Sequence, residues 1–207
     1  MSSIVRFPLS SDLLRRLPRH PDWKYEMIDG EVLLSPRPRP LLLRRRTDLA
    51  VPAASVGDAE LRIVDPRRDR TRIAKLLVDV WADEDPYRSL ENPAAVLRAE
   101  IERSLDTLTL GVVAVDGQGI CATVLVPPSS TSMVPTLAWL TVHSEARDRG
   151  LATALLGVVV DALSARGVRE LESATSAANV ASLRWHLTRG FQVAPDLLRE
   201  ALRRNRP

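Results

Sequence analysis

Between Thr136 and Gly167 the spacing of the hydrophobic positions changes once. The run Leu137–Val142 is mainly apolar and rich in residues that favour strands. After a short polar turn, apolar residues recur every three or four positions, which is the spacing of one helix face. This stretch predicts a strand, a loop and a helix, and we expect the rest of the chain to be organised around it. The apolar helix positions are Leu151, Leu155, Leu156, Val159 and Leu163.

Similar patterns predict further elements on both sides. A strand begins at Leu61, and Asp69 is a suitable cap for a helix whose apolar positions continue to Trp81. A strand at Arg169–Ala174 should run parallel to the strand at Leu137–Val142, because a helix connects the two. The other expected elements are a helix at Pro93–Leu105, a hairpin of strands Leu110–Val115 and Ile120–Val126, a strand beginning at Phe191, and a terminal helix capped by Asp196.

The N-terminal part of the chain contains one clear turn signal. Asp29-Gly30 lies between two runs of mixed polar and apolar residues, and this dipeptide is a common signal for a tight hairpin. We expect strands at Lys24–Ile28 and Glu31–Ser35, preceded by a short helix within residues 1–20. The sequence W-K-Y-E-x-x-D-G-E resembles the first segment of some restriction-endonuclease-like proteins. No later carboxylate-x-Lys pair follows, so we interpret the segment as a hairpin without an assigned use.

The segment Pro36–Arg46 reads PRPRPLLLRRR. Its prolines favour an extended backbone, and we interpret it as a solvated linker. A contact to RNA or to an acidic protein is the alternative. The residues up to Ala59 have the composition of a loop. We therefore expect an N-terminal extension at residues 1–59 and a folded domain at residues 60–207.

Composition narrows the class of protein. The 207 residues, 45% of them hydrophobic, are enough for a sizeable core. No apolar run has the length of a membrane span and no secretion signal is visible, so we expect a cytoplasmic protein. The single Cys121 excludes an internal disulfide. Residues 1–59 carry ten Lys/Arg against seven Asp/Glu, whereas residues 60–207 carry nineteen of each, which argues against nucleic-acid binding by the folded domain.

The loop between the central strand and its helix carries the candidate chemistry. It reads R-D-R-G-L-A from Arg147 to Ala152, with Gly150 where the chain turns into the helix. The first turn of a helix has unpaired N–H groups and a partial positive charge, and Arg147 and Arg149 add to it. We expect this end to bind a diphosphate. A Walker loop and a G-x-G-x-x-G dinucleotide motif are both absent from the sequence.

The run L-T-V-H-S-E-A-R-D-R-G-L-A resembles the acyl-CoA loop of the GNAT N-acetyltransferases, Arg/Gln-x-x-Gly-x-Gly/Ala after a strand ending in Leu-x-Val. The run N-V-A-S-L-R-W-H-L-T-R-G-F resembles the second signature of that family, although tyrosine is usual where this chain has His186. The resemblance extends over residues 61–193. The matching residues are Leu140, Val142, Arg147, Gly150, Ala152, Asn179, Trp185, Gly190 and Phe191.

This resemblance implies an α+β fold, the GNAT acyl-CoA acyltransferase fold. Its central sheet is mostly antiparallel with splayed parallel fourth and fifth strands, and here a helix and a hairpin extend the N-terminus. Most members end with a seventh strand for which this chain has no pattern, so we hypothesise that the N-terminal hairpin pairs beside the strand at Phe191. The resemblance implies acetyl-CoA as co-substrate and no metal. It assigns to acetyl-CoA the residues Leu140, Thr141, Val142, Arg147, Asp148, Arg149, Gly150, Leu151, Ala152, Thr153, Asn179 and Ser182.

The resemblance also implies residues for the reaction and the acceptor. His186 stands where a tyrosine typically protonates the departing thiolate, and a histidine packed on the last helix is the alternative. Glu172 shares a strand face with the position of a base in some relatives, and an ordinary surface carboxylate is the alternative. The connection between the first two helices walls the acceptor pocket in the family. We therefore expect a cationic amine, or alternatively only solvent, at Asp83, Glu84, Asp85 and Tyr87.

Together these patterns lead us to expect an N-acetyltransferase. It would transfer an acetyl group from acetyl-CoA to a primary amine of a small molecule or protein by direct attack in a ternary complex. One alternative is a CoA-binding module of the same fold without turnover, and another is a fusion whose basic N-terminal segment docks on a partner. We expect neither nucleic acid nor membrane as a partner, and a homodimer stays open.

Overall fold

The computed structural model describes residues 5–8, 23–28, 31–36, 40–82, 92–128, 134–176 and 179–194. The chain divides into two compact units. One consists of residues 1–41 and 175–183, and the other of residues 42–174 and 184–207. Within the described ranges, no helix has the length and hydrophobicity needed to span a membrane.

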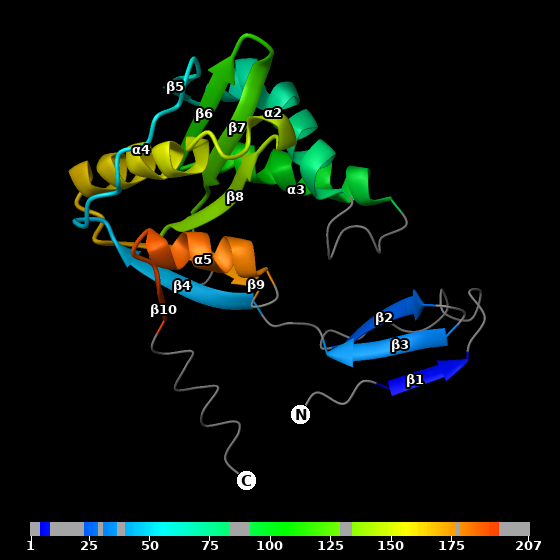
Figure 1. Ribbon diagram of the computed structural model, residues 1–207. Helices are drawn as coiled ribbons and strands as arrows, with labels where there is room; N and C mark the ends of the chain where they lie inside the picture. The colour runs from blue at the N-terminus through cyan, green and yellow to red at the C-terminus, as the bar shows by residue number, and fades with distance from the viewer. Residues whose placement is uncertain are drawn as a thin grey trace. The chain divides into compact units, whose positions relative to one another are not determined.

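A three-stranded antiparallel sheet lies in the first unit (Figure 1). It consists of β1 (Val5–Pro8), β2 (Trp23–Ile28) and β3 (Glu31–Pro36), with β3 in the middle. The pairing of β2 with β3 confirms the hairpin that the Asp29-Gly30 signal predicted. Strand β1 was not predicted, and the expected helix after it lies outside the described residues.

The main sheet has seven strands in the order β10-β4-β9-β8-β7-β6-β5. The pairs β10–β4, β7–β8, β6–β7 and β5–β6 are antiparallel, whereas β8 and β9 are parallel. This arrangement confirms the mostly antiparallel sheet with one parallel pair. The strands are β4 (Pro40–Arg46), β5 (Glu60–Ile63), β6 (Leu110–Asp116), β7 (Gly119–Val126), β8 (Thr136–Val142), β9 (Glu170–Ser176) and β10 (Gln192–Val193).

Helices cover both faces of this sheet, with α4 on one face and α2 and α3 on the other (Figure 1). Val113 of β6 and Leu125 of β7 are buried in a core cluster with Ile73, Leu77 and Leu97 of α2 and α3. The helices are α2 (Pro66–Trp81), α3 (Pro93–Asp106), the 3₁₀ turn η2 (Ser144–Ala146), α4 (Leu151–Ala165) and α5 (Val180–Thr188).

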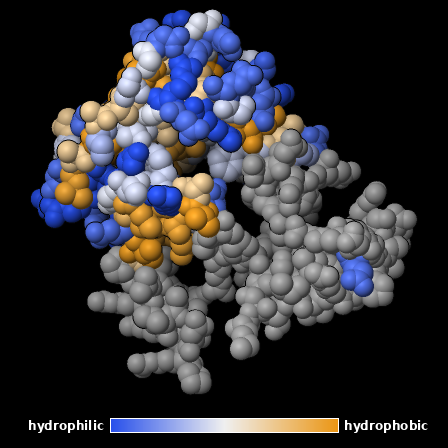
Figure 2. All heavy atoms as spheres, in the orientation of Figure 1, coloured by the Kyte–Doolittle hydropathy of each residue, from blue (hydrophilic) through white to orange (hydrophobic). Residues whose placement is uncertain are grey.

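Helix α5 is much less buried than α4. Seven of the fifteen side chains of α4 are buried, which follows from the apolar spacing of its sequence. On α5 the side chains of Val180 and Leu187 are exposed, and Figure 2 shows hydrophobic surface over this helix. Only His186 is buried on α5 among the described side chains.

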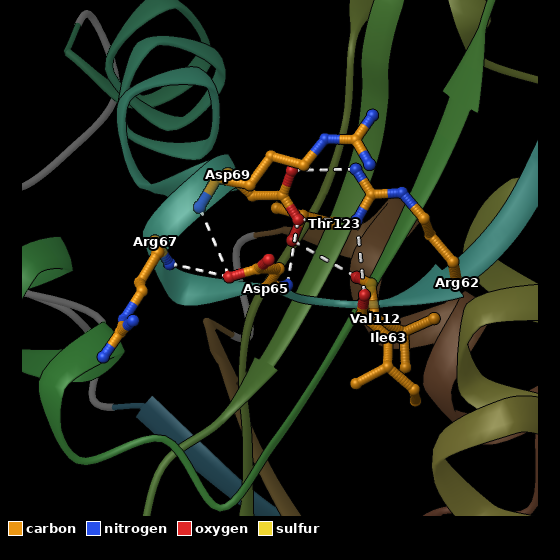
Figure 3. Close-up of polar contacts among 8 residues, drawn as sticks. Arg62, Ile63, Asp65, Arg67, Asp69, Val112 and Thr123 are labelled. Carbon is orange, nitrogen blue, oxygen red and sulfur yellow. Dashed lines mark hydrogen bonds and ion pairs between the residues drawn. The ribbon is translucent and has the colours of Figure 1, made fainter.

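The predicted cap of α2 is wrong, because Asp65 is the N-cap and not Asp69. The Asp65 carboxylate accepts hydrogen bonds from the N–H groups of Arg67 and Arg68. Asp69 lies one turn further on, fully buried, and accepts two hydrogen bonds from the Arg62 guanidinium at 2.6 and 2.8 Å (Figure 3). A buried carboxylate needs such a partner, and the pair ties β5 to α2.

The interpretation of Pro36–Arg46 as a linker is wrong for Pro40–Arg46. These residues form β4, which pairs with β10 through Arg44↔Gln192 and Leu43↔Val193. The N-terminal hairpin does not take this position, because β2 and β3 belong to the separate three-stranded sheet. A strand from the N-terminal part of the chain therefore does lie beside β10, but it is a later one than we hypothesised. The domain boundary expected between residues 59 and 60 stays a prediction.

Candidate functional site

The first turn of α4 begins at a glycine. Its N-cap is Gly150, with φ +78° and no side-chain cap. The N–H groups of Thr153 and Ala154 donate to the Gly150 carbonyl. In the described part of the chain, the N–H groups of Gly150, Leu151 and Ala152 donate to no backbone carbonyl. Unpaired N–H groups at the positive end of a helix dipole are a phosphate-binding arrangement.

Only glycine fits at this turn. A Cβ at position 150 would lie 2.7 Å from the carbonyl oxygen of Ser55 and 3.2 Å from the Cβ of Ala54. The positive φ adds strain for any residue with a side chain. The sequence predicted this glycine turn correctly. It gave no sign that residues 54 and 55, about a hundred positions earlier, would lie against it.

The two arginines of the turn have different environments. Arg147 is exposed, and within the described ranges its side chain has no hydrogen bond or ion pair. Arg149 forms ion pairs with Asp58 at 2.6 Å and with Asp116 at 3.3 Å. Asp148 between them is exposed, with φ +60°. The expected positive charge is therefore free at Arg147 and already paired at Arg149.

The carboxylate of Asp116, which pairs with Arg149, also contacts the backbone of Gln118. The Gln118 N–H donates to it at 3.0 Å, and this bond, with the Arg149 guanidinium nearby, lowers the pKa of Asp116. Burial, together with the charge of Asp116, raises the pKa of the Cys121 thiol to about 11. Cys121 is thus protonated at neutral pH and unsuited to act as a nucleophile.

Strands β8 and β9 pair only where they begin. Their register contains Thr136↔Glu172 and Leu137↔Ser173, and both strands then continue without further pairs. The predicted splay of the two parallel strands is confirmed. On the β9 side, the backbone of Leu140–Val142 has no β9 partner in the described register, which is the edge that the pantetheine arm is expected to fill.

A β-bulge interrupts β8 opposite this open edge. The register with β7 shifts between Thr123↔Thr141 and Leu125↔Ala138, and Trp139 has φ +49°. A bulge re-aims a side chain, and a left-handed aromatic residue is strained, both of which are frequent at functional sites. Thr141 is buried and accepts a hydrogen bond from Trp81 Nε1 at 2.8 Å.

The bulge places Trp139 at the edge of a surface depression that the sequence did not predict. Its Nε1 donates to the Ser104 hydroxyl at 3.1 Å, and Trp81 packs edge-on with the ring centroids 6.3 Å apart. Glu100, Arg103, Ser104 and the C-cap Thr107 follow the i, i+3, i+4, i+7 spacing of one helix face, which is the signal that could have found them, whereas Asp106 does not. The lining residues are Glu100, Arg103, Ser104, Asp106, Thr107, Pro127 and Trp139.

The two predicted catalytic residues are both buried and both have partners. The His186 Nε2 lies 2.9 Å from the Ser173 hydroxyl, and its ring packs edge-on against Trp185 and Phe191. This packing corresponds to the alternative of a histidine held in the core. Glu172 is an ion-pair partner of Arg44, at 2.7 Å, and not a surface carboxylate. Their roles in catalysis stay predictions.

Other predicted residues have local roles or lie outside the described residues. Asn179 caps α5, because its side-chain oxygen accepts from the Ser182 N–H at 3.0 Å. The Thr153 hydroxyl accepts from Arg189 Nε at 3.1 Å, so this side chain is occupied. The acceptor residues Asp83, Glu84, Asp85 and Tyr87 lie outside the described residues.

A mixed sheet with two diverging parallel strands, connected by a helix that begins at a left-handed glycine, defines an acyl-CoA acyltransferase fold. The chain belongs to the acetyltransferase (GNAT) family, whose model matches residues 74–191. This match confirms the family predicted from the two sequence signatures. Acetyl-CoA is the co-substrate typical of that family. No curated protein sequence matches the chain.

Solved structures share the fold. A GCN5-related N-acetyltransferase from Sphaerobacter thermophilus is 20% identical, with a TM-score of 0.57 over 76% of this chain and 50% of that one. This chain therefore spans half the length of that protein. A predicted acetyltransferase from Clostridium acetobutylicum, solved with acetyl-CoA, is 18% identical, with a TM-score of 0.51 over 66% and 92%. AAC(6')-Iy with the bisubstrate analogue CoA-S-monomethyl-acetylneamine is 19% identical, with the same score and coverage.

Proposed function

We propose that this chain transfers an acetyl group from acetyl-CoA to a primary amine by direct attack in a ternary complex. The observation that carries the proposal is the first turn of α4, where Gly150 has φ +78° and the N–H groups of Leu151 and Ala152 have no backbone acceptor among the described residues. A diphosphate fits this turn, because it accepts from several N–H groups at once and its charge suits the helix dipole. Arg147 adds an exposed positive charge beside it.

The open edge of β8 supports the rest of the proposal. The backbone of Leu140–Val142 offers N–H and C=O groups on the side where β9 has diverged. An unpaired strand edge is stabilised by an extended partner, and one of its N–H groups can donate to a carbonyl that gains negative charge. Bound acetyl-CoA supplies the acetyl group as a thioester. We include Asp148, Asn179 and Ser182 among the residues that hold it.

The acceptor is proposed to be a cationic amine of a small molecule or a protein. Asp83, Glu84, Asp85 and Tyr87 are its proposed contacts, on the family's pattern. The depression at Trp139 is also lined by Glu100, Arg103 and Asp106, and Asp106 already pairs with Arg70.

Release of the CoA thiol across a panel of amines tests this function. The panel should include aminoglycosides, polyamines, amino acids and peptides with free N-termini, each with acetyl-CoA and the purified chain. We expect thiol release that depends on one class of amine. A thiol reagent can report it with little background, because the one cysteine of the chain is buried with its pKa raised to about 11. Full CoA affinity without release on any amine would contradict the proposed transfer.

One observation favours a second function, CoA binding without turnover. Both candidate acid–base groups are engaged within the chain, Glu172 with Arg44 and His186 with Ser173. A buried ion-paired carboxylate is a poor base, since taking a proton would break the pair. CoA affinity together with a silent amine panel would support this function.

Substitutions of His186 separate its two roles. If the ring stabilises the departing thiolate, His186→Ala lowers kcat by about ten- to a hundredfold, while the KM for acetyl-CoA is unchanged. His186→Tyr, which restores the usual family residue, retains turnover. Ser173→Ala is the matched control, because it removes the 2.9 Å contact and leaves the ring. Equal kcat for the wild type and both His186 variants would show that the ring only packs.

A further inference from the structure

Arg149 connects three segments that are far apart in the sequence. It directly precedes Gly150, the N-cap of α4. Its guanidinium reaches Asp116 at the end of β6, at 3.3 Å, and Asp58 in the connection between β4 and β5, at 2.6 Å. The Arg149 side chain therefore connects the turn before α4 to β6 and to the segment between β4 and β5.

The connection that carries Asp58 runs along α4. A Cβ at Gly157 would lie 4.0 Å from Val51, and one at Gly150 would lie 2.7 Å from the Ser55 carbonyl oxygen. The segment thus follows the helix from its middle to its first turn. The ion pair between Asp58 and Arg149 comes at the end of this path, beside the turn.

The carboxylates of Asp116 and Asp58 neutralise much of the positive charge of the Arg149 guanidinium, so this residue attracts a diphosphate only weakly. Asp116 is only 12% exposed, so losing Arg149 would leave a mostly buried carboxylate without a counter-charge, which is costly. Asp58 is 78% exposed, and its bond is correspondingly weak. Arg147 has neither restraint, because its side chain is exposed and has no partner in the described residues.

We propose that Arg149 is a positioning residue, which holds the turn before α4 against Asp116 and Asp58 and so keeps the N–H groups after Gly150 open to the diphosphate of acetyl-CoA. Arg147 is then the arginine that attracts the diphosphate. This inference rests on the proposed function. A positioning role and direct phosphate binding by Arg149 predict opposite effects of Asp116→Asn on CoA affinity.

Titration calorimetry with CoA on the full chain distinguishes the two roles. If Arg149 positions the turn, Arg149→Gln and Asp116→Asn each weaken CoA binding by about three- to tenfold. The double variant is no weaker than Arg149→Gln alone, because that substitution already removes the bond to Asp116. If Arg149 instead binds phosphate, Asp116→Asn frees it and tightens CoA binding, which would overturn the proposal. The side-chain amide introduced by Asp116→Asn can still accept from the Gln118 N–H, so the turn of β6 is preserved.

Salt separates Arg147 from Arg149. The loss caused by Arg147→Gln disappears at high salt, since screening shortens the range of its charge from about 10 Å at 0.1 M to about 3 Å at 1 M. The loss caused by Arg149→Gln persists, because it changes the position of backbone groups. Arg149→Lys restores part of the affinity. Equal salt dependence for the two glutamine variants would contradict the positioning role.

A second ion pair in the same unit supplies the matched control. Arg62→Gln disturbs the Arg62–Asp69 pair at β5 and α2, and we expect lower stability with unchanged CoA affinity. If Arg149→Gln fails to fold, Asp116→Asn and Asp58→Asn test its two bonds separately, and we expect the smaller loss of CoA affinity at the exposed Asp58. A wild-type chain without CoA affinity would overturn the proposed function and this inference together. Wild-type binding with an unchanged Kd for Arg149→Gln and Asp116→Asn would overturn the inference alone.

Discussion

The carboxylate of Asp69 has no exposure to solvent and receives three hydrogen bonds. Two come from the Arg62 guanidinium and one from the Asp65 N–H, at 3.0 Å. These bonds favour the charged form, and the pKa of Asp69 lies below its ordinary value of 3.8 mainly because of Arg62. A buried charge of this kind is stable only while its partner is present.

Removing that carboxylate should destabilise the fold. We expect Asp69→Ala to lower the free energy of unfolding by about 3–5 kcal/mol, because the Arg62 guanidinium loses its partner. Urea unfolding at neutral pH measures the change. Asp106→Ala is a suitable control, since its ion pair with Arg70 is at the surface and should contribute about 0–1 kcal/mol. Similar losses for the two variants would contradict the importance of burial.

The same pair gives a pH dependence with a definite sign. The pKa of Asp69 in the folded protein is below its ordinary value, which applies in the unfolded chain. The stabilisation of the fold by the Asp69–Arg62 pair is therefore fully present above the unfolded pKa. It is lost as the pH falls through the folded pKa. The difference in unfolding free energy between the wild type and Asp69→Asn should therefore shrink below about pH 4. A difference that grows on acidification would contradict this assignment.

Among the strands of the main sheet, β4 is the one that the sequence could not reveal. Its run L-L-L-R-R-R follows alternating prolines, and a run of arginines is normally a solvated segment. In the fold, Leu43 is fully buried and Arg45 is 2% exposed. The Arg45 guanidinium donates to the carbonyls of Arg46, Leu49, Ala50 and Arg189. These acceptors come from folding and have no signature in the sequence.

Two deletions test the place of β4 in the sheet. Removing residues 1–39 takes away β1, β2 and β3 and leaves β4. We expect this variant to unfold cooperatively and to bind CoA as the full chain does. Removing residues 1–59 also removes β4 and the segment against Gly150, and should abolish both properties. Circular dichroism and CoA titration measure them, and an intact, binding product of the longer deletion would contradict the role of β4.

Local signals, by contrast, predicted α4 and its glycine turn correctly. The apolar spacing of α4 and the positive φ of Gly150 depend on neighbouring residues. The N-cap of α2 was misassigned by one turn because two aspartates, Asp65 and Asp69, both suit a cap. Tertiary pairing with Arg62 decided between them.

At the scale of the whole molecule, the family signatures predicted the sheet and its diverging strands. The candidate site was predicted only where it is made of the backbone of β8 and α4. The contacts that surround it come from distant segments, such as Ser55 against Gly150 and Asp58 with Arg149. Such contacts depend on the path of the chain across the sheet, which a single sequence does not encode in any local pattern.

The central claim is that the first turn of α4 binds the diphosphate of acetyl-CoA, and calorimetric titration of CoA into three proteins tests it most directly. Gly150 and Gly167 have nearly the same φ, +78° and +75°, but only at Gly150 would a Cβ meet neighbouring atoms. Each alanine variant should lose about 1–2 kcal/mol of stability from backbone strain. We predict that Gly150→Ala weakens CoA binding by about tenfold or more, while Gly167→Ala binds as the wild type does. Equal affinity for all three proteins would contradict the account.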